Sequence, residues 1–213
     1  MIEAGRSRRL LLALLVASAF GGCGRDFEDE KPPAPPTTAE LSRFVAETRE
    51  PAYWLGPRFR GLAVSHVSAV RGHVGLTYGP WSCDSGCTED GGVWTGPRDI
   101  GALSEADGYT GVVSRKCWSR VGKAVAVLLG CDPGGYPQEL VIYTGTREIL
   151  VTSLLTRTDE IPARAVVRRL RPLNAEAPWP LLRPTPLSCR GFERVDPRYR
   201  RHMPQALQPR TAC

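Results

Sequence analysis

Cysteine is the residue that most restricts how this chain can fold. Six of its seven cysteines lie in three couples that are close in sequence, namely Cys83 with Cys87, Cys117 with Cys131, and Cys189 with Cys213. Sequence alone leaves about fifteen connectivities open for six cysteines, and we favour local pairing within the three couples. Such bonds would stabilise one domain with long disulfide-stapled loops.

The seventh cysteine, Cys23, ends an N-terminal segment with the features of an export signal. A basic stretch around Arg8 is followed by an apolar run from Leu10 to Phe20 and by two glycines. A bilayer-spanning helix needs about 20 apolar residues, so this run is too short for a permanent anchor. The segment predicts a signal peptide over residues 1–22 and an oxidising destination in which disulfides persist.

The sequence Phe20-Gly21-Gly22-Cys23 resembles the lipobox of bacterial prolipoproteins, in which small residues precede the cysteine that becomes lipidated. The resemblance implies lipidation at Cys23 and attachment to the outer face of the cytoplasmic membrane. Phe20 departs from the usual pattern, and Ala17-Ser18-Ala19 offers an alternative cleavage site that would release a secreted protein. Assigning Cys23 to the lipid leaves six cysteines, an even number that can pair completely.

Composition divides the rest of the chain into three parts. Residues 23–38 hold the lipidated cysteine followed by acidic residues and prolines, which favour an extended tether. Residues 39–172 are predicted to form one globular domain, because their length and apolar content suffice for a core. Residues 173–213 are basic and rich in proline, and we expect them to pack on the domain surface without a second core.

The predicted fold class is α+β, with a small, mainly antiparallel sheet of five or six strands and two short helices. Residues 79–110 are rich in glycine, proline and aspartate and are predicted to form a long loop that cysteines hold in place. Apolar periodicity predicts the helices at 39–48 and 161–171, and strands at 62–70, 73–78, 111–114, 123–129, 139–144 and 147–154.

No motif in the chain specifies a reaction, and we assign no catalytic residue. His66 and His73 could form an acid–base pair with an aspartate, but two polar strand residues that face solvent are the simpler interpretation. Cys83 and Cys87 with a histidine could bind zinc only as thiolates, which an oxidising exterior removes. We therefore expect neither a metal site nor a cofactor.

Two groups of residues are candidates for ligand binding. Trp81 and Trp94 lie in the glycine-rich stretch and would offer a sugar or a peptide an exposed aromatic platform, although burial is the commoner fate of tryptophan. Arg164, Arg168 and Arg171 share one face of the second predicted helix. They would attract anionic lipid headgroups or phosphate-rich wall polymers, or they simply form a solvated face.

Overall charge excludes one class of partner. The formal net charge of +6 is modest, and no nucleic-acid-reading motif accompanies it, so no nucleic acid is expected. We expect a membrane-attached envelope lipoprotein that acts as a non-enzymatic binding or scaffolding module, with an unknown protein partner. An exported hydrolase of wall or extracellular polymers and a solute-binding accessory are the alternatives. Residues 53–61 are similar to a stretch of uncharacterised lipoproteins of high-GC bacteria, which implies no activity.

Overall fold

The computed structural model of the chain describes residues 36–70, 72–79, 81–82, 88–89, 91–98, 115–129, 131, 139–152 and 163–213. These residues belong to one compact unit that spans Pro32–Cys213. The predicted signal peptide, Cys23 and nearly all of the predicted tether lie outside the described residues. Within the described residues, no helix is long and apolar enough to cross a bilayer.

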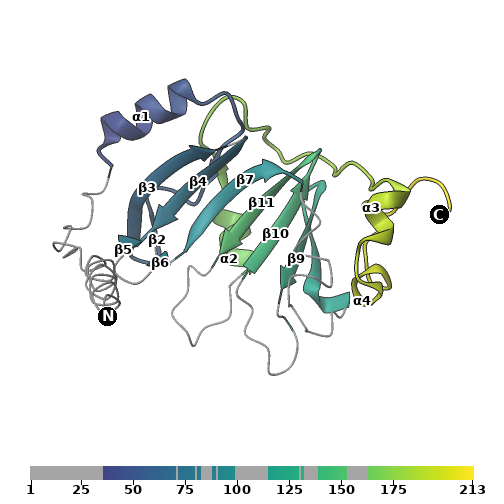
Figure 1. The fold of residues 1–213 in the computed structure, drawn as a ribbon. Coiled ribbons are helices and arrows are strands. Elements are labelled where there is room, and N and C mark those ends of the chain that lie inside the picture. The colour runs from purple at the N-terminus through teal and green to yellow at the C-terminus, as the bar shows by residue number, and fades with distance from the viewer. Residues whose placement is uncertain are drawn as a thin grey trace, which may run out of the picture. The chain divides into compact units, whose positions relative to one another are not determined.

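An antiparallel sheet of eight strands is the main element of this unit (Figure 1). Its strand order is β2-β3-β4-β7-β11-β10-β9-β8. The predicted α+β class with a mainly antiparallel sheet is therefore confirmed. Along the chain, the strands of this sheet are β2 (Arg58–Phe59), β3 (Leu62–Val70), β4 (His73–Tyr78), β7 (Gly92–Pro97), β8 (Trp118–Val121), β9 (Ala124–Leu129), β10 (Glu139–Thr144) and β11 (Arg147–Thr152).

Shorter elements surround the sheet. In α1, the Thr37 hydroxyl accepts a hydrogen bond from the Glu40 backbone N–H, and the Glu40 carboxylate accepts one from the Thr37 backbone, which forms a capping box. The described helices are α1 (Thr38–Glu47), the 3-10 turn η3 (Arg115–Cys117), α2 (Ala163–Arg169), α3 (Cys189–Glu193) and α4 (Pro197–Arg200). Two small ribbons pair β1 (Tyr53–Trp54) with β12 (Arg171–Pro172), and β5 (Trp81–Ser82) with β6 (Thr88–Glu89).

Both predicted hairpins are present. Strands β3 and β4 pair from Val70 opposite His73, and β10 and β11 pair from Thr144 opposite Arg147. Gly145 turns the second hairpin with a φ of 56°, a left-handed conformation that glycine adopts without steric cost. The strand expected at 111–114 lies outside the described residues.

The prediction that residues 79–110 form one long loop is wrong for residues 92–97. These residues form β7, which lies between β4 and β11 in the middle of the sheet. Its glycines suggested a turn, but their small size serves packing instead. A Cβ at Gly92 would lie 2.8 Å from Nε1 of Trp94, and a Cβ at Gly96 would collide with the His73 imidazole, so both aromatic rings rest directly on backbone.

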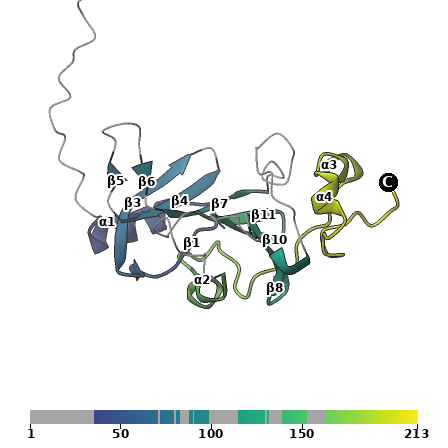
Figure 2. The same ribbon diagram turned by 90° about the horizontal axis from the view of Figure 1, so that it is seen from below.

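One face of the sheet packs against α2 and the chain that follows it. Leu76, Val93 and Ile149 are fully buried on this face, in one cluster with Val166 of α2 and with Leu170 just after that helix. Figure 2 shows α2 and β1 on the same side of the sheet. Because strand residues alternate between faces, the neighbours of these side chains point to the opposite side.

The opposite face, at the end of the sheet formed by β8, β9 and β10, is covered by the C-terminal segment. We expected residues 173–213 to form no second core, and the structure corrects this. Leu187, Tyr199 and Met203 are buried against Val127 of β9 and Tyr143 of β10 in a second apolar cluster. Apolar residues spaced irregularly among prolines and arginines gave no periodic signal, yet α3 and α4 bring them onto one surface.

Two disulfides hold the two sides of this second cluster in place. Cys117 pairs with Cys131 and Cys189 pairs with Cys213, with Cα–Cα separations of 5.7 and 5.4 Å. These are two of the three local pairs that the cysteine spacing favoured. Cys83 and Cys87 lie outside the described residues.

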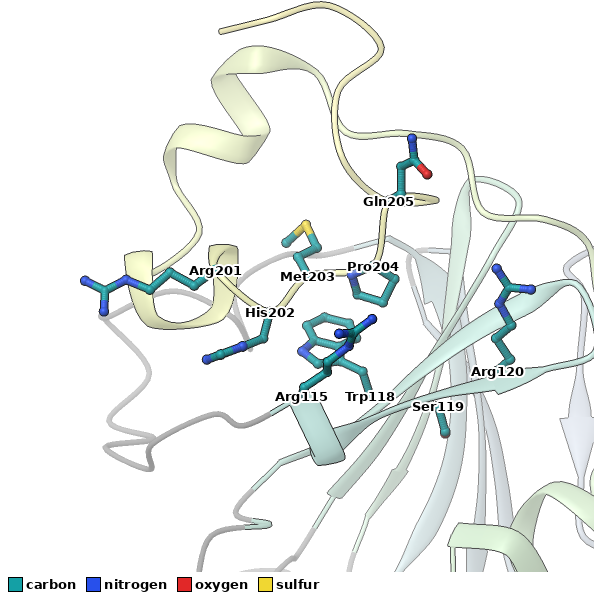
Figure 3. Close-up of a pocket in the computed structure, with 9 residues that line it drawn as sticks. All are labelled: Arg115, Trp118, Ser119, Arg120, Arg201, His202, Met203, Pro204 and Gln205. Carbon is teal, nitrogen blue, oxygen red and sulfur yellow. The ribbon is translucent and has the colours of Figure 1, made fainter.

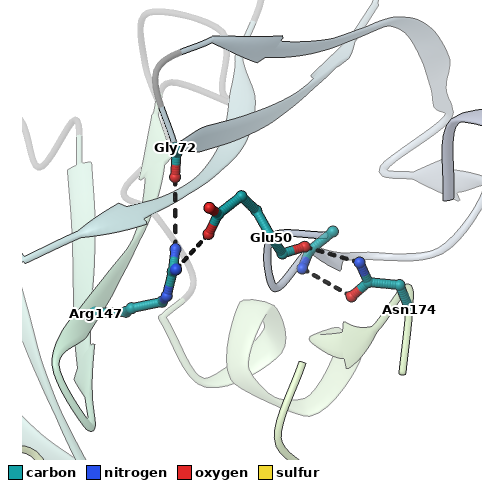
Figure 4. Close-up of polar contacts among 5 residues, drawn as sticks. Glu50, Gly72, Arg147 and Asn174 are labelled. Atoms are coloured by element: carbon teal, nitrogen blue, oxygen red, sulfur yellow. Dashed lines mark hydrogen bonds and ion pairs between the residues drawn. The ribbon is translucent and has the colours of Figure 1, made fainter. Parts of the chain in front are cut away.

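Polar contacts connect residues 50–52 to strand β11 and to the chain after β12 (Figure 4). The Asn174 side chain donates a hydrogen bond to the Glu50 carbonyl (2.8 Å) and accepts one from the Ala52 N–H (3.0 Å). The Arg147 guanidinium forms an ion pair with the Glu50 carboxylate and donates to the Gly72 carbonyl. Residues 50–52 are thereby held against both the sheet and the C-terminal segment.

Candidate functional site

A basic cavity lies between the β8 edge of the sheet and the chain that follows α4. Its volume is about 540 Å³, within the range of about 300–1,000 Å³ that is usual for ligand sites. The described residues that line it come from two stretches, one around η3 and β8 (Arg115, Trp118, Ser119 and Arg120) and one after α4 (Arg201, His202, Met203, Pro204 and Gln205).

Figure 3 shows how these side chains lie. The guanidinium groups of Arg115 and Arg120 point toward the C-terminal segment, whose Met203 and Pro204 face the Trp118 ring. The Arg201 guanidinium points away from the others, so we place it at the rim of the cavity. The interior is thus basic along one side and apolar along the other.

The walls of the cavity are held by covalent and apolar contacts. Cys117 is buried directly before Trp118, and its disulfide to Cys131 restrains the β8 side. On the other side, the buried carboxylate of Asp196 caps α4 by accepting from the Arg198 N–H and also pairs with the Arg198 guanidinium. These hydrogen bonds with Arg198 keep the pKa of Asp196 below its usual value, so the cap is ionised at neutral pH.

Arg115 and Arg120 differ from Arg147 and Arg198 in their partners. Arg147 and Arg198 each pair with a carboxylate. Within the described part of the chain, no carboxylate lines the cavity, and no ion pair is formed by Arg115 or Arg120. Positive charge is therefore available to a negatively charged ligand.

Trp118 contributes a polar group as well as an apolar ring. The residue is 9% exposed, and its Nε1–H is buried without a hydrogen-bond partner in the described structure. A buried donor without an acceptor costs about 1–3 kcal/mol, so such groups usually have a function or a missing partner. Because this nitrogen is closed off from the cavity surface, the ring is the part of Trp118 that a ligand in the cavity would contact.

A second candidate surface follows α2 and the chain after it. Arg164 and Arg168 are exposed on α2, and the Arg171 guanidinium lies over the Trp179 ring, 5.5 Å from its centroid. Trp179 and Leu182 are each 47% exposed, the large apolar side chains that the described part of the chain leaves most open to solvent. We call Arg164, Arg168, Arg171, Trp179 and Leu182 the basic face.

Trp94, one of the two predicted aromatic candidates, does not lie in an exposed loop. Trp94 belongs to the central strand β7 and not to a loop, and its partly buried ring occupies the space above Gly75 and Gly92. Trp81 lies in β5, and its side chain is outside what the structure describes. Trp94 is not among the described residues that line the basic cavity.

His66 and His73 do not lie opposite each other in their hairpin. His66 lies opposite Thr77, and His73 lies opposite Val70. Among the described residues, no group of three or more histidine, cysteine, aspartate or glutamate side chains is placed to hold a metal ion.

Sequence reasoning missed Arg115, Trp118 and Arg120, as well as the exposed Trp179. The only local signal was the basic and aromatic composition on both sides of Cys117. No protein-family model, curated protein or solved structure matches the chain. The cavity and the basic face are the features on which a function can be argued.

Proposed function

We propose that this chain is an extracytoplasmic lipoprotein, anchored through Cys23 to the outer face of the cytoplasmic membrane, that acts as a binding or scaffolding module rather than as an enzyme. The lipobox resemblance and the disulfides support export. The observation that carries the proposal is the basic face, where the Arg171 guanidinium lies over the ring of the exposed Trp179.

The chemistry of this face suits an anionic bilayer surface. Tryptophan prefers the membrane–water interface, because its ring is apolar and its N–H is polar. The stretch 163–185 contains five arginines and a single acidic residue, Glu176. Each basic residue near an anionic membrane contributes about 1 kcal/mol of attraction. The Arg171 guanidinium above Trp179 would reach headgroup phosphates while the ring enters the acyl boundary.

Lipid anchor and basic face would act together. A diacylglyceryl group supplies two acyl chains, which suffice for stable attachment, so the basic face is not needed to hold the chain at the membrane. In this arrangement the anchor holds the chain at the membrane and the basic face sets the orientation of the domain. Surfaces that point away from the bilayer are then presented to partners.

The anchor is tested by the intact mass of protein purified from membranes, before and after reduction and thiol alkylation. We expect a chain that begins at Cys23 with a diacylglyceryl-sized increment, and six further thiols that alkylate only after reduction. A mature chain that begins near Phe20 without lipid would contradict the proposal and support a secreted protein.

The basic face is tested separately, with chain that begins at Gly24 and vesicles that contain phosphatidylglycerol. Arg168→Gln and Arg171→Gln should each weaken vesicle binding about fivefold, and Trp179→Ala should weaken it further. Arg210→Gln removes the same charge from another exposed position and serves as the control. Equal losses in all three arginine variants would indicate general charge attraction and contradict the assigned face.

A further inference from the structure

We propose that the basic cavity between β8 and the C-terminal segment binds the phosphate group of an organic phosphate. The inference is independent of membrane attachment, because it rests on other residues than those of the basic face. Its observations are the Arg115 and Arg120 side chains, which form no ion pair within the described residues, and the cavity that they line together with the Trp118 ring.

The positive charge of the cavity favours an anionic ligand. The side chains of Arg115 and Arg120 line the cavity together with His202 at its edge, and no carboxylate lines it within the described residues. A cationic ligand would meet only repulsion there. Two guanidinium groups at one cavity make its electrostatic potential positive, which favours an anion.

The donor set favours phosphate over carboxylate. A guanidinium group presents its N–H donors as a planar fork that matches phosphate oxygens in bidentate geometry. A phosphate monoester has three terminal oxygens, enough for both arginines. Ser119 and Gln205 also line the space, but Figure 3 shows their side chains directed away from Arg115 and Trp118, so the phosphate is assigned to the two guanidinium groups. A single carboxylate has two oxygens and would leave part of this donor set unused.

The apolar side of the cavity indicates that the phosphate carries a carbon skeleton. The Trp118 ring faces Met203 and Pro204 across the cavity, which provides a surface for the C–H groups of a polyol or a sugar. The Trp118 Nε1–H is closed off from the cavity surface, so this side of the cavity offers the ligand apolar contact. A volume of about 540 Å³ holds a ligand larger than phosphate alone.

The cavity is preorganised. One disulfide restrains the chain beside Trp118, and the other closes the segment from Cys189 to Cys213 that supplies the second wall. Both walls also belong to the apolar cluster that contains Trp118 and Met203. Little conformational entropy is lost on binding when the walls are already fixed.

The test follows the indole N–H resonances of the five tryptophans by NMR during titration with glycerol 3-phosphate. Trp118→Phe assigns the Trp118 resonance by its disappearance. We expect that resonance to shift in a saturable manner, while free glycerol at the same concentration leaves it unmoved. Arg115→Gln and Arg120→Gln should each weaken binding about tenfold or more, as expected for a charge-assisted hydrogen bond.

Two controls keep the result interpretable if a variant misfolds. Arg43→Gln removes the same charge from an exposed position on α1, outside the cavity lining, and should bind as the unmodified chain does. The remaining indole resonances report whether each variant is folded. The proposal is overturned if Trp118 does not respond, if Arg43→Gln weakens binding as much as Arg115→Gln, or if acetate binds more tightly than glycerol 3-phosphate.

The source of the phosphate is distinguished by two further titrations of the same resonance. Soluble poly(glycerol phosphate) represents a wall polymer, and short-chain phosphatidylglycerol represents a lipid headgroup. The ligand that shifts the Trp118 resonance at the lower concentration identifies the source. If neither shifts it while glycerol 3-phosphate does, the site is assigned to a free organic phosphate.

Discussion

The glycine beneath Trp94 offers a direct test of the central sheet. Gly75 lies in β4 beside β7, and a Cβ at this position would lie 2.2 Å from a ring carbon of Trp94. Nonbonded carbon atoms normally approach to about 3.5 Å, so the ring has to move by about 1 Å or more in the variant Gly75→Ala. Overpacking of this kind usually costs about 1–3 kcal/mol.

The same substitution also has a smaller, stabilising effect on the free energy of unfolding. Replacing glycine by alanine in a strand gains about 0.5–1 kcal/mol, because the unfolded chain loses conformational freedom. We therefore expect Gly75→Ala to lower the free energy of unfolding by about 1–2 kcal/mol. In a Trp94→Ala background the clash is absent, and the same change should be neutral or stabilising.

The four chains of this double-mutant cycle are compared by urea unfolding with the disulfides intact. Far-UV circular dichroism is the appropriate signal, since tryptophan fluorescence changes with Trp94 itself. A coupling of about 1.5 kcal/mol or more between the two positions is expected for groups in contact. An equal loss of stability from Gly75→Ala in both backgrounds would refute the packing argument.

Three further predictions concern buried polar groups and cross-links. Asn174→Ala should lower the free energy of unfolding by about 2–4 kcal/mol, since two backbone groups lose their partner, whereas Glu176→Ala nearby should change it by less than about 0.5 kcal/mol. Replacing Cys189 and Cys213 by serine should cost about 3 kcal/mol in a thermal melt, and a cost below about 1 kcal/mol would contradict this. Since Asp196 has a lowered pKa in the folded state, its ionised form stabilises the fold above its unfolded pKa of about 4, and the contribution disappears as the pH falls through the folded value. Asp196→Asn should thus be less stable than the unmodified chain at pH 7 and should approach it at low pH in urea titrations, and a constant difference across that range would contradict this linkage.

Local patterns predicted the parts of the fold that depend on local chemistry. The β10–β11 hairpin was predictable because alternating apolar residues flank the Gly145 turn. The helix α1 was predictable because Thr37 and Glu40 have capping-box spacing. In each case the residues that specify the element are close neighbours in the chain.

The elements that were missed depend on distant contacts. Gly92 looked like a turn residue because the ring of Trp94 that needs the space is visible only in the folded sheet. The cavity was not predictable because Arg115 and Trp118 meet Met203 only through the packing of α3 and α4 on the sheet. No spacing rule connects stretches so far apart in sequence.

The second apolar cluster determines when the domain can become compact. Val127 and Tyr143 lie on strands made early, but Leu187, Tyr199 and Leu207, which cover them, belong to the C-terminal segment. A nascent chain that ends before residue 187 would expose this apolar surface of the sheet to water, and the surface could associate with other chains. Such a chain would need chaperones until synthesis has passed residue 207. C-terminal truncation should therefore cause aggregation rather than yield a shorter soluble domain.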